Sequence, residues 1–272
     1  MRPMTSPISP LIATQISAHC SALARSIAVE VVPETGSTNV DLLARLDTLT
    51  VPTLLIAEKQ TAGRGRAGRS WLSAPGSALT FSLAWPFALE QQALLGLPLA
   101  VGVALAQALA VLDVAVQLKW PNDVLKEGKK LAGVLIETAQ PSVRAAGSAR
   151  VWAVIGIGLN LRMPEELEQQ INRPVADAAW LAQMDRNKLL AKLMDALAVC
   201  LHQFAHTGFA AFVANWNHFH AYAGQQVTIL DQGQIVQQGC ALGVDQSGCL
   251  LLRNALGGIV PVIAGDVSLR PV

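Results

Sequence analysis

Residues 63–69 read Gly-Arg-Gly-Arg-Ala-Gly-Arg, and Ser70 and Trp71 follow directly. Glycine permits sharp turns and lets backbone N–H groups come close to a ligand. Arginine adds a permanent positive charge and binds carboxylate or phosphate through paired hydrogen bonds. The stretch therefore predicts a loop that holds an anion. It is not a nucleotide-hydrolase phosphate loop, because the pattern G-x-x-x-x-G-K-[ST] is absent.

The segments around this loop predict a folded region of strands and helices. Apolar and β-branched runs predict strands over residues 27–32, 53–57, 78–84, 114–120, 131–138 and 151–159. Helical periodicity and end signals predict helices over residues 40–46, 91–112, 185–208 and 209–218. The Arg-Gly loop thus connects two strands, which argues against a solvated flexible tail.

After Gly224 the pattern changes to short strands separated by Asp, Gln and Gly turns. These strands are expected over residues 227–230, 234–238, 249–253, 259–262 and 267–269. Such spacing is typical of a small antiparallel barrel of about 50 residues. We therefore expect an N-terminal lead-in over residues 1–27 with one short helix, a catalytic domain over 28–221 and a barrel over 222–272.

Composition indicates a cytoplasmic protein with a large core. Of 272 residues, 52% are hydrophobic and 14% are charged, and the net charge of +1 argues against non-specific nucleic-acid binding. The four cysteines contain no C-x-x-C pair and no signal peptide is visible, so free thiols in a reducing compartment are expected. Residues 93–112 carry no charge and reach membrane-spanning length. We interpret them as a buried core helix, so no membrane partner is expected.

Three further motifs carry candidate ligand groups. In Lys119-Trp-Pro-Asn-Asp123, Pro121 ends a strand and leaves a polar turn where ligand groups are often mounted. Lys130 directly precedes a buried strand and can point its ammonium toward an anion. In Gly156-Ile-Gly-Leu-Asn160 the glycines permit close approach, and the carboxamide offers a donor and an acceptor. Taken singly, these motifs also fit a turn, a surface lysine and a β-bulge.

Together, in this order and spacing, the motifs resemble those of the biotin protein ligases (biotin–[acetyl-CoA-carboxylase] ligases). They are STN at 37–39, Q-x-x-GRGR-x-GR-x-W at 60–71, KWPND at 119–123, KLAG at 130–133 and GIGLN at 156–160. The resemblance covers residues 28–272 and includes the closing Ser268-Leu269-Arg270. It implies an α+β fold: a mixed β-sheet catalytic domain flanked by helices, of the class II aminoacyl-tRNA synthetase/biotin ligase type, followed by an SH3-like β-barrel.

The resemblance also implies a two-step reaction. Biotin would first react with ATP to give biotinyl-5′-AMP, with Mg²⁺ bound mainly through the triphosphate. A lysine of a biotin carboxyl carrier protein would then take the biotinyl group. The chemistry of the residues agrees, because a carboxylate and a polyphosphate in one pocket require cations and N–H donors around them.

Residue roles follow from the motifs by resemblance. The catalytic residues would be Lys130 and Arg66, and Asp123 would lie on the side of the pocket that holds Mg²⁺. The residues expected to bind biotin are Ser37, Thr38, Asn39, Gln60, Gly63, Arg64, Gly65, Arg66, Lys130 and Gly133. Those expected to bind ATP and the adenylate are Arg64, Arg66, Arg69, Trp71, Lys130, Asn160 and Arg270, with Asp266 as a further candidate.

Two departures from the family pattern affect the expected activity. Thr228 stands where some members carry a lysine that assists ATP binding. About 27 residues precede the catalytic region, whereas the winged helix-turn-helix of bifunctional members needs roughly 60, so we expect no DNA binding. The family often dimerises through the catalytic sheet, which leaves a homodimer open.

Two alternative functions stay open at this level. A lipoate or octanoate ligase or transferase would share the catalytic fold, but Ser37, Thr38, Asn39 and Gln60 favour a ureido ring, which needs hydrogen-bond partners that a fatty chain does not. A nucleic-acid-binding protein could use the Arg-Gly loop on phosphates, although aromatic residues are not interleaved with its arginines.

Overall fold

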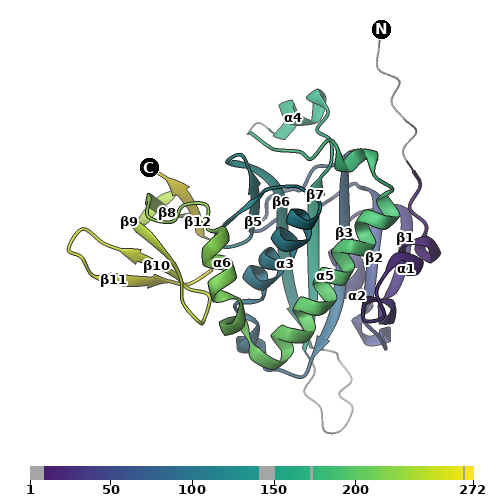
Figure 1. Ribbon diagram of the computed structural model, residues 1–272, viewed down its shortest axis with the longest axis horizontal. Coiled ribbons are helices and arrows are strands. Elements are labelled where there is room, and N and C mark those ends of the chain that lie inside the picture. Colours follow the sequence, from purple (N-terminus) through teal and green to yellow (C-terminus); the bar gives the residue numbers. More distant parts are fainter. Residues whose placement is uncertain (1–8, 141–150, 172–173, 266) are drawn as a thin grey trace.

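The computed structural model describes residues 9–140, 151–171, 174–265 and 267–272, which form two β-sheets with helices packed around the first (Figure 1). The first sheet has seven strands in the order β1-β2-β3-β7-β6-β5-β4. The strands are β1 (Ala28–Thr35), β2 (Thr53–Gln60), β3 (Ala78–Phe87), β4 (Gln117–Lys119), β5 (Asp123–Lys126), β6 (Lys129–Ala139) and β7 (Val151–Asn160). Only β1 and β2 pair in parallel, so the predicted mixed sheet is confirmed.

Two long helices cover one face of this sheet (Figure 1). They are α3 (Leu97–Val111) and α5 (Arg186–Thr207), and Asp185 caps α5 by accepting a hydrogen bond from Asn187 N. The expected helix over 91–112 is divided, because Gln91–Leu94 forms a separate 3₁₀ turn (η3) and α3 begins beside Pro98, which cannot donate a backbone hydrogen bond. Residues Gln91–Val111 are long and apolar enough to cross a membrane, yet 72% of that window is buried inside the protein. That burial is the pattern of a core helix.

The opposite face carries α2 (Thr38–Ala44) and a smaller apolar core. That core consists of Leu42, Leu46, Leu55, Ala84, Trp152 and Val154. Strand side chains alternate between faces, so Phe87 of β3 meets the ring of Phe204 on α5 while Ser82 and Ala84 face α2. The sheet surface next to α2 is where the candidate site lies.

The segment before β1 is held against α5. It contains α1 (Ala13–His19), the short helix expected in the lead-in. Arg186 on α5 is buried and makes two hydrogen bonds to the Glu58 carboxylate, of 2.7 and 2.8 Å, and two more to the carbonyl oxygen of Ser9. This arginine therefore ties the N-terminal segment to β2 and α5.

The remaining helical elements are short. The sequence did not predict α4 (Glu165–Ile171), because its only buried residue is Leu167 and it shows no apolar periodicity. The 3₁₀ turns besides η3 are η1 (Ala24–Ser26), η2 (Leu46–Thr48), η4 (Leu181–Gln183) and η5 (Phe209–Phe212).

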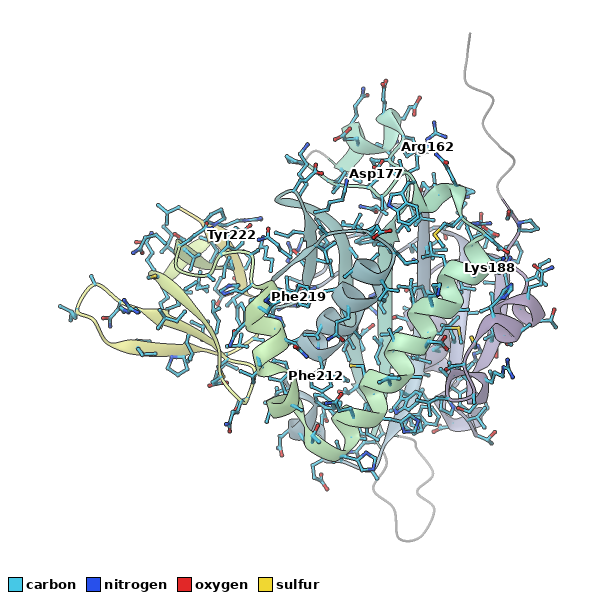
Figure 2. The ribbon with its side chains drawn as sticks, viewed as in Figure 1. Arg162, Asp177, Lys188, Phe212, Phe219 and Tyr222 are labelled. Atoms are coloured by element: carbon cyan, nitrogen blue, oxygen red, sulfur yellow. The ribbon has the colours of Figure 1, made fainter. Side chains whose placement is uncertain are left out.

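The second sheet follows α6 (Val213–Phe219), and Phe219 and Tyr222 lie where α6 leads into it (Figure 2). Its strands, in the order β11-β10-β9-β8-β12, are β8 (Gln226–Asp231), β9 (Gln234–Val244), β10 (Leu250–Arg253), β11 (Ile259–Val262) and β12 (Val267–Pro271). All pairs are antiparallel, as predicted. The Asp231-Gln-Gly turn has positive φ at Gln232 and Gly233, which a two-residue hairpin requires. The SH3-like closure stays a prediction.

Candidate active site

The Arg-Gly loop folds back on itself between β2 and β3. Gly65 N donates to the carbonyl of Arg69 at 2.6 Å, and Trp71 N donates to the carbonyl of Gly63 at 2.9 Å. Ala67 and the glycine after it have φ values of 53° and 69°, which allow the tight reversal. The reversal brings Trp71 back over the sheet, next to the loop's own beginning.

Two glycines of β7 leave space on the sheet surface for two side chains. Gly156 and Gly158 lie two positions apart on β7 and therefore face the same side. A Cβ on Gly158 would stand 2.2 Å from Trp71 Cε2, and a Cβ on Gly156 would stand 2.3 Å from Asn39 Oδ1. The pairing of β7 runs through both glycines without a register shift, so they form no β-bulge. They instead provide the space that the Trp71 and Asn39 side chains occupy against the sheet.

A wall of neutral polar groups borders one end of the site. Gln60 Oε1 accepts from Thr38 N at 2.9 Å and lies 3.2 Å from Thr38 Oγ1. Thr38 Oγ1 lies 2.6 Å from Ser82 Oγ, which in turn donates to Asn39 Oδ1 at 2.5 Å. Ser37, at the start of α2, is buried beside them. The four residues expected to bind biotin from STN and Gln60 are thus assembled, and Ser82 joins them.

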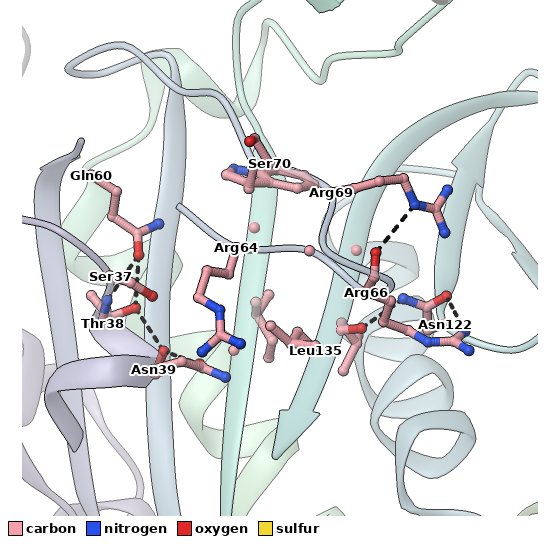
Figure 3. Close-up of a pocket in the computed structure, with 18 of the residues that line it drawn as sticks. Ser37, Thr38, Asn39, Gln60, Arg64, Arg66, Arg69, Ser70, Asn122 and Leu135 are labelled. Atoms are coloured by element: carbon pink, nitrogen blue, oxygen red, sulfur yellow. Dashed lines mark hydrogen bonds between the residues drawn. The ribbon is translucent and has the colours of Figure 1, made fainter. Parts of the chain in front are cut away.

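Glu137 on β6 extends this wall, although no sequence motif contains it. Asn39 Nδ2 donates to Glu137 Oε2 at 2.9 Å, and Arg64 Nη1 lies 3.2 Å from Glu137 Oε1. A charged residue beyond the KLAG motif, on the same face as Gly133, was the available signal. Arg64 therefore lies across the site, between the polar wall and the rest of the loop (Figure 3).

Cations gather at the other end of the site. Lys130 Nζ lies 2.5 Å from Asp123 Oδ1 and 5.6 Å from the centre of the Trp71 ring. Lys119, opposite Asp123 in the β4–β5 ladder, has its pKa lowered from 10.5 to about 8 by burial, while Asp123 acts in the opposite direction. Arg270, Lys130 and the last loop arginine also lower it, so positive charges crowd around one carboxylate.

Arg66 links three parts of the chain. Its Nη1 donates to Asn122 Oδ1 at 3.1 Å, and its Nη2 donates to the carbonyl oxygen of Gly265, which precedes β12. The carbonyl of Arg66 accepts from Arg69 Nε at 3.2 Å. Figure 3 shows Arg66 and Asn122 together, on the side opposite Gln60 and Thr38. The loop is thereby attached both to the KWPND turn and to the second sheet's chain segment.

Asn160 lies in an adjoining hollow rather than in the main pocket. Its Nδ2 donates to the carbonyl of Ala176 at 3.0 Å and approaches that of Lys130 at 3.4 Å. The hollow is lined by Arg69, Ser70, Trp71, Leu72, Lys130, Asn160, Gln170, Ile171 and Val175. Trp71 and Lys130 line both spaces, so the two hollows adjoin around these side chains.

The main pocket unites most of the residues that the sequence singled out. It is lined by Ser37, Thr38, Asn39, Gln60, Arg64, Gly65, Arg66, Arg69, Trp71, Asp123, Lys130 and Gly133, together with Ser70, Phe81, Ser82, Asn122, Val134, Leu135, Gly156, Ile157 and Gly158. Gly63 supports the loop through its carbonyl instead of lining the pocket. Among the described residues, no group of three or more His, Cys, Asp or Glu side chains could hold a metal ion.

Two residues expected to reach the nucleotide, Arg270 and Asp266, and the departure from the family pattern at Thr228 remain to be placed. Arg270 is on β12 opposite Thr228 and lines neither hollow, although its charge acts on Lys119. Thr228 is buried and accepts a hydrogen bond from Gln238 Nε2 at 3.1 Å. Asp266 lies outside the described residues.

Comparison with known families agrees with this arrangement. Residues 29–160 match the biotin/lipoate A/B protein ligase family, and residues 222–270 match the biotin protein ligase C-terminal domain. The fold and the site therefore define a protein of the biotin/lipoate ligase class.

Individual relatives narrow the class. A biotin–[acetyl-CoA-carboxylase] ligase of Mycobacterium tuberculosis is 37% identical over 252 residues, covering 88% of this chain and 88% of that protein. The bifunctional ligase/repressor BirA of Escherichia coli is 34% identical over 249 residues, covering 89% of this chain and 74% of that protein. A biotin protein ligase from Aquifex aeolicus, solved with biotin and ATP, matches with a TM-score of 0.71 at 29% identity, covering 90% of this chain and 99% of that one. The chain belongs to the biotin protein ligase family.

Proposed function

We propose that this chain activates biotin with ATP as biotinyl-5′-AMP and transfers the biotinyl group to a lysine of a biotin carboxyl carrier protein. The observation that carries the proposal is a single pocket with a neutral polar wall at one end and converging cations at the other. The names of the relatives, which include biotin–[acetyl-CoA-carboxylase] ligases, support the same reaction.

In the first step an oxygen of the biotin carboxylate attacks the α-phosphorus of ATP. A new P–O bond forms, the bond to the bridging oxygen breaks, and pyrophosphate leaves. Both reactants are anions, so positive charge must offset their repulsion and the charge that develops in the transition state. Lys130, whose ammonium pairs with Asp123 and lies near the Trp71 ring, would move that ammonium to the reacting oxygens. Arg66 would hold the phosphate from the loop side.

In the second step the neutral amine of the acceptor lysine attacks the carbonyl carbon of the mixed anhydride. An amide bond forms, AMP leaves, and a proton is lost from the nitrogen. The residues that bound the phosphate would now stabilise the leaving AMP. No side chain needs to become covalently attached to biotin.

The remaining residues divide between the two ends of the pocket. Ser37, Thr38, Asn39 and Gln60 would bind the ureido ring, with Arg64 over it. In the adjoining hollow, the Trp71 ring would stack on adenine, and Asn160 Oδ1 would accept from its amino group. Arg270 would reach the nucleotide from the second sheet.

Mg²⁺ would be held mainly by the triphosphate. Asp123 is a carboxylate in the pocket that could contribute one ligand, which is the mode that Mg²⁺ commonly uses in nucleotide sites. The ion would offset phosphate charge beside Lys130.

We further propose a catalytic domain over residues 28–221, a C-terminal domain over 222–272, a cytoplasmic location and a homodimer as the assembly to test. We expect no DNA partner.

The test is exchange of labelled pyrophosphate into ATP, measured with biotin and separately with lipoate. Biotin-dependent exchange is expected, because adenylate formation is reversible and releases pyrophosphate. Exchange with lipoate alone would show a lipoate ligase instead. Binding of duplex DNA at physiological ionic strength would support the nucleic-acid alternative.

A further inference from the structure

Glu137 contacts both sides of the biotin end of the pocket. Its two carboxylate oxygens contact different partners, Asn39 Nδ2 at 2.9 Å and Arg64 Nη1 at 3.2 Å. The Glu137 side chain is 24% exposed, whereas that of Arg64 is 49% exposed, so the carboxylate is the more withdrawn of the two from solvent. One residue therefore joins two groups that come from α2 and from the Arg-Gly loop.

The strand register explains how Glu137 reaches Asn39. Ser82, Gly156 and Leu135 are cross-strand partners on β3, β7 and β6. Asn39 lies over Gly156, the middle of this row, where a Cβ would stand 2.3 Å from its Oδ1. Glu137 follows Leu135 by two residues and so faces the same side. The Asn39 amide is held between Ser82 on one side and Glu137 on the other.

The contacts permit only one order of protons along the wall. An ionised carboxylate only accepts hydrogen bonds, so Asn39 must turn its NH₂ toward Glu137 and its oxygen toward Ser82. The single Ser82 proton then goes to Asn39 Oδ1. The 2.6 Å contact between Ser82 and Thr38 consequently uses the Thr38 proton.

Gln60 is held separately, by the backbone of Thr38. Thr38 Oγ1 has given its proton to Ser82, so the 3.2 Å approach to Gln60 Oε1 is not a second donation by the same proton. Gln60 Oε1 is instead held by the backbone N of Thr38 at 2.9 Å. Hydrogen bonds in such a chain polarise one another, and the donations from Thr38 Oγ1, Ser82 Oγ and Asn39 Nδ2 all point toward the negative charge of Glu137.

We infer that Glu137 is a positioning residue for biotin, which acts through Asn39 and Arg64 to fix the donors and acceptors that meet the ureido ring. The inference rests on the proposed function, because it concerns the ureido end of the same pocket. A ureido ring presents one carbonyl acceptor and two N–H donors, so a reversed amide would place like groups against each other. Glu137 prevents that reversal without lining the pocket itself.

The first test is Glu137→Gln, which keeps the shape and removes the charge. Its amide can donate as well as accept, so it no longer dictates how Asn39 is turned. We expect the Kd for biotin, measured by calorimetry with biotin alone, to rise about 10- to 100-fold. The KM for biotin should rise equally, while kcat and the KM for ATP stay within about twofold. Glu137→Asp, which restores the charge, should recover part of the affinity.

Glu127→Gln is the matched control, since Glu127 is an exposed carboxylate in the turn between β5 and β6. It should bind biotin like the wild type. An unchanged biotin Kd in Glu137→Gln would overturn the inference, as would equal increases in the KM for biotin and for ATP. Should Glu137→Gln fail to fold, Ser82→Ala tests the same chain, and unchanged biotin affinity there would also overturn it.

Failure of the inference is distinguishable from failure of the proposed function. A wild-type protein without biotin-dependent pyrophosphate exchange would refute the function. A wild type that exchanges, combined with a Glu137→Gln variant that binds biotin normally, would refute only the role of Glu137.

Discussion

The two ends of the pocket are built on different physical principles. At the end proposed to bind biotin (the biotin end), neutral groups from α2, β2 and β3 hold one another at 2.5–3.2 Å, and one carboxylate closes the chain. At the end proposed to bind the nucleotide (the nucleotide end), Lys130 and Arg66 are held by Asp123, Asn122 and a carbonyl oxygen. An uncharged ring is recognised by a fixed pattern of donors and acceptors. Cations that bind reacting phosphates must give up the contacts that hold them before ATP arrives. The contacts of Lys130 and Arg66 are therefore of a kind that phosphate oxygens can replace.

Of the changes considered, removal of the Lys130 side chain is expected to give the largest difference in effect between the two ends of the pocket. Lys130→Ala should lower the rate of adenylate formation about 10²- to 10³-fold, because loss of one electrostatic stabiliser of a transition state has that size. Biotin affinity measured without ATP should fall much less than this rate, because the groups proposed to bind the ureido ring are unchanged. Single-turnover formation of biotinyl-5′-AMP is the measurement.

Lys129→Ala is the control for this variant, because Lys129 is the neighbouring lysine and is exposed. Circular dichroism should show both variants folded. A Lys130→Ala enzyme as fast as wild type would remove Lys130 from the chemistry and leave only its pairing with Asp123.

A pair of glycine substitutions tests whether the ends act independently. Gly158→Ala would push its Cβ into the Trp71 indole, and Gly156→Ala would push its Cβ into the Asn39 amide. We expect the first to raise the KM for ATP and the second the KM for biotin, each about 10- to 100-fold. Steady-state kinetics with each substrate varied in turn would show it.

Gly36→Ala serves as the reference, since its added Cβ meets nothing within 4 Å and its φ is not positive. If both glycine variants raised both KM values equally, the two ends would form one coupled site. The contrast between a fixed wall and an exchangeable cation cluster would then be wrong.

Sequence patterns were sufficient for the parts of the site that carry their own motif. The Arg-Gly loop, Lys130 and the glycines of GIGLN could be singled out because turn formation, charge at a strand end and close approach each require particular residue types. The strands β2, β3, β6 and β7 could be predicted because they are continuous apolar runs. Most of the residues expected at the site line the same pocket.

The partners of these residues could not be predicted, because they depend on register and on contacts between distant segments. Ser82 and Glu137 face Asn39 only through the pairing of β3, β6 and β7. Arg66 meets the Gly265 carbonyl across 199 positions of sequence. The four-residue strand β5 carries charges at both ends and lies between turns, so no periodicity marked it.

A buried histidine between the two sheets predicts how the stability of the protein depends on pH. His220 is 5% exposed, and its ring lies 4.8 Å from that of Trp216 between centroids, at an interplanar angle of 39°. Its backbone pairs with Leu118 of β4. Burial lowers its pKa from 6.5 to about 4. The folded protein thus holds the neutral ring, and its contribution to stability is full above pH 6.5 and is lost as pH falls toward about 4.

Thermal unfolding at pH 7 and pH 5 measures this contribution. The wild type should lose up to about 2 kcal/mol of stability through this group at pH 5, whereas His220→Leu should lose less between the same two pH values. Equal losses in the two proteins would mean that His220 does not titrate with unfolding.

The smallest effect is expected where the cation cluster touches the second sheet. Asn122→Ala removes one partner of Arg66 and leaves the Gly265 carbonyl in place. We expect biotinyl-5′-AMP to leave the enzyme about three- to tenfold faster, since one hydrogen bond to a charged group is lost and another remains. Release is measured by trapping free adenylate after rapid dilution. Unchanged release would mean that the contact with Asn122 does not help to position Arg66 on the adenylate.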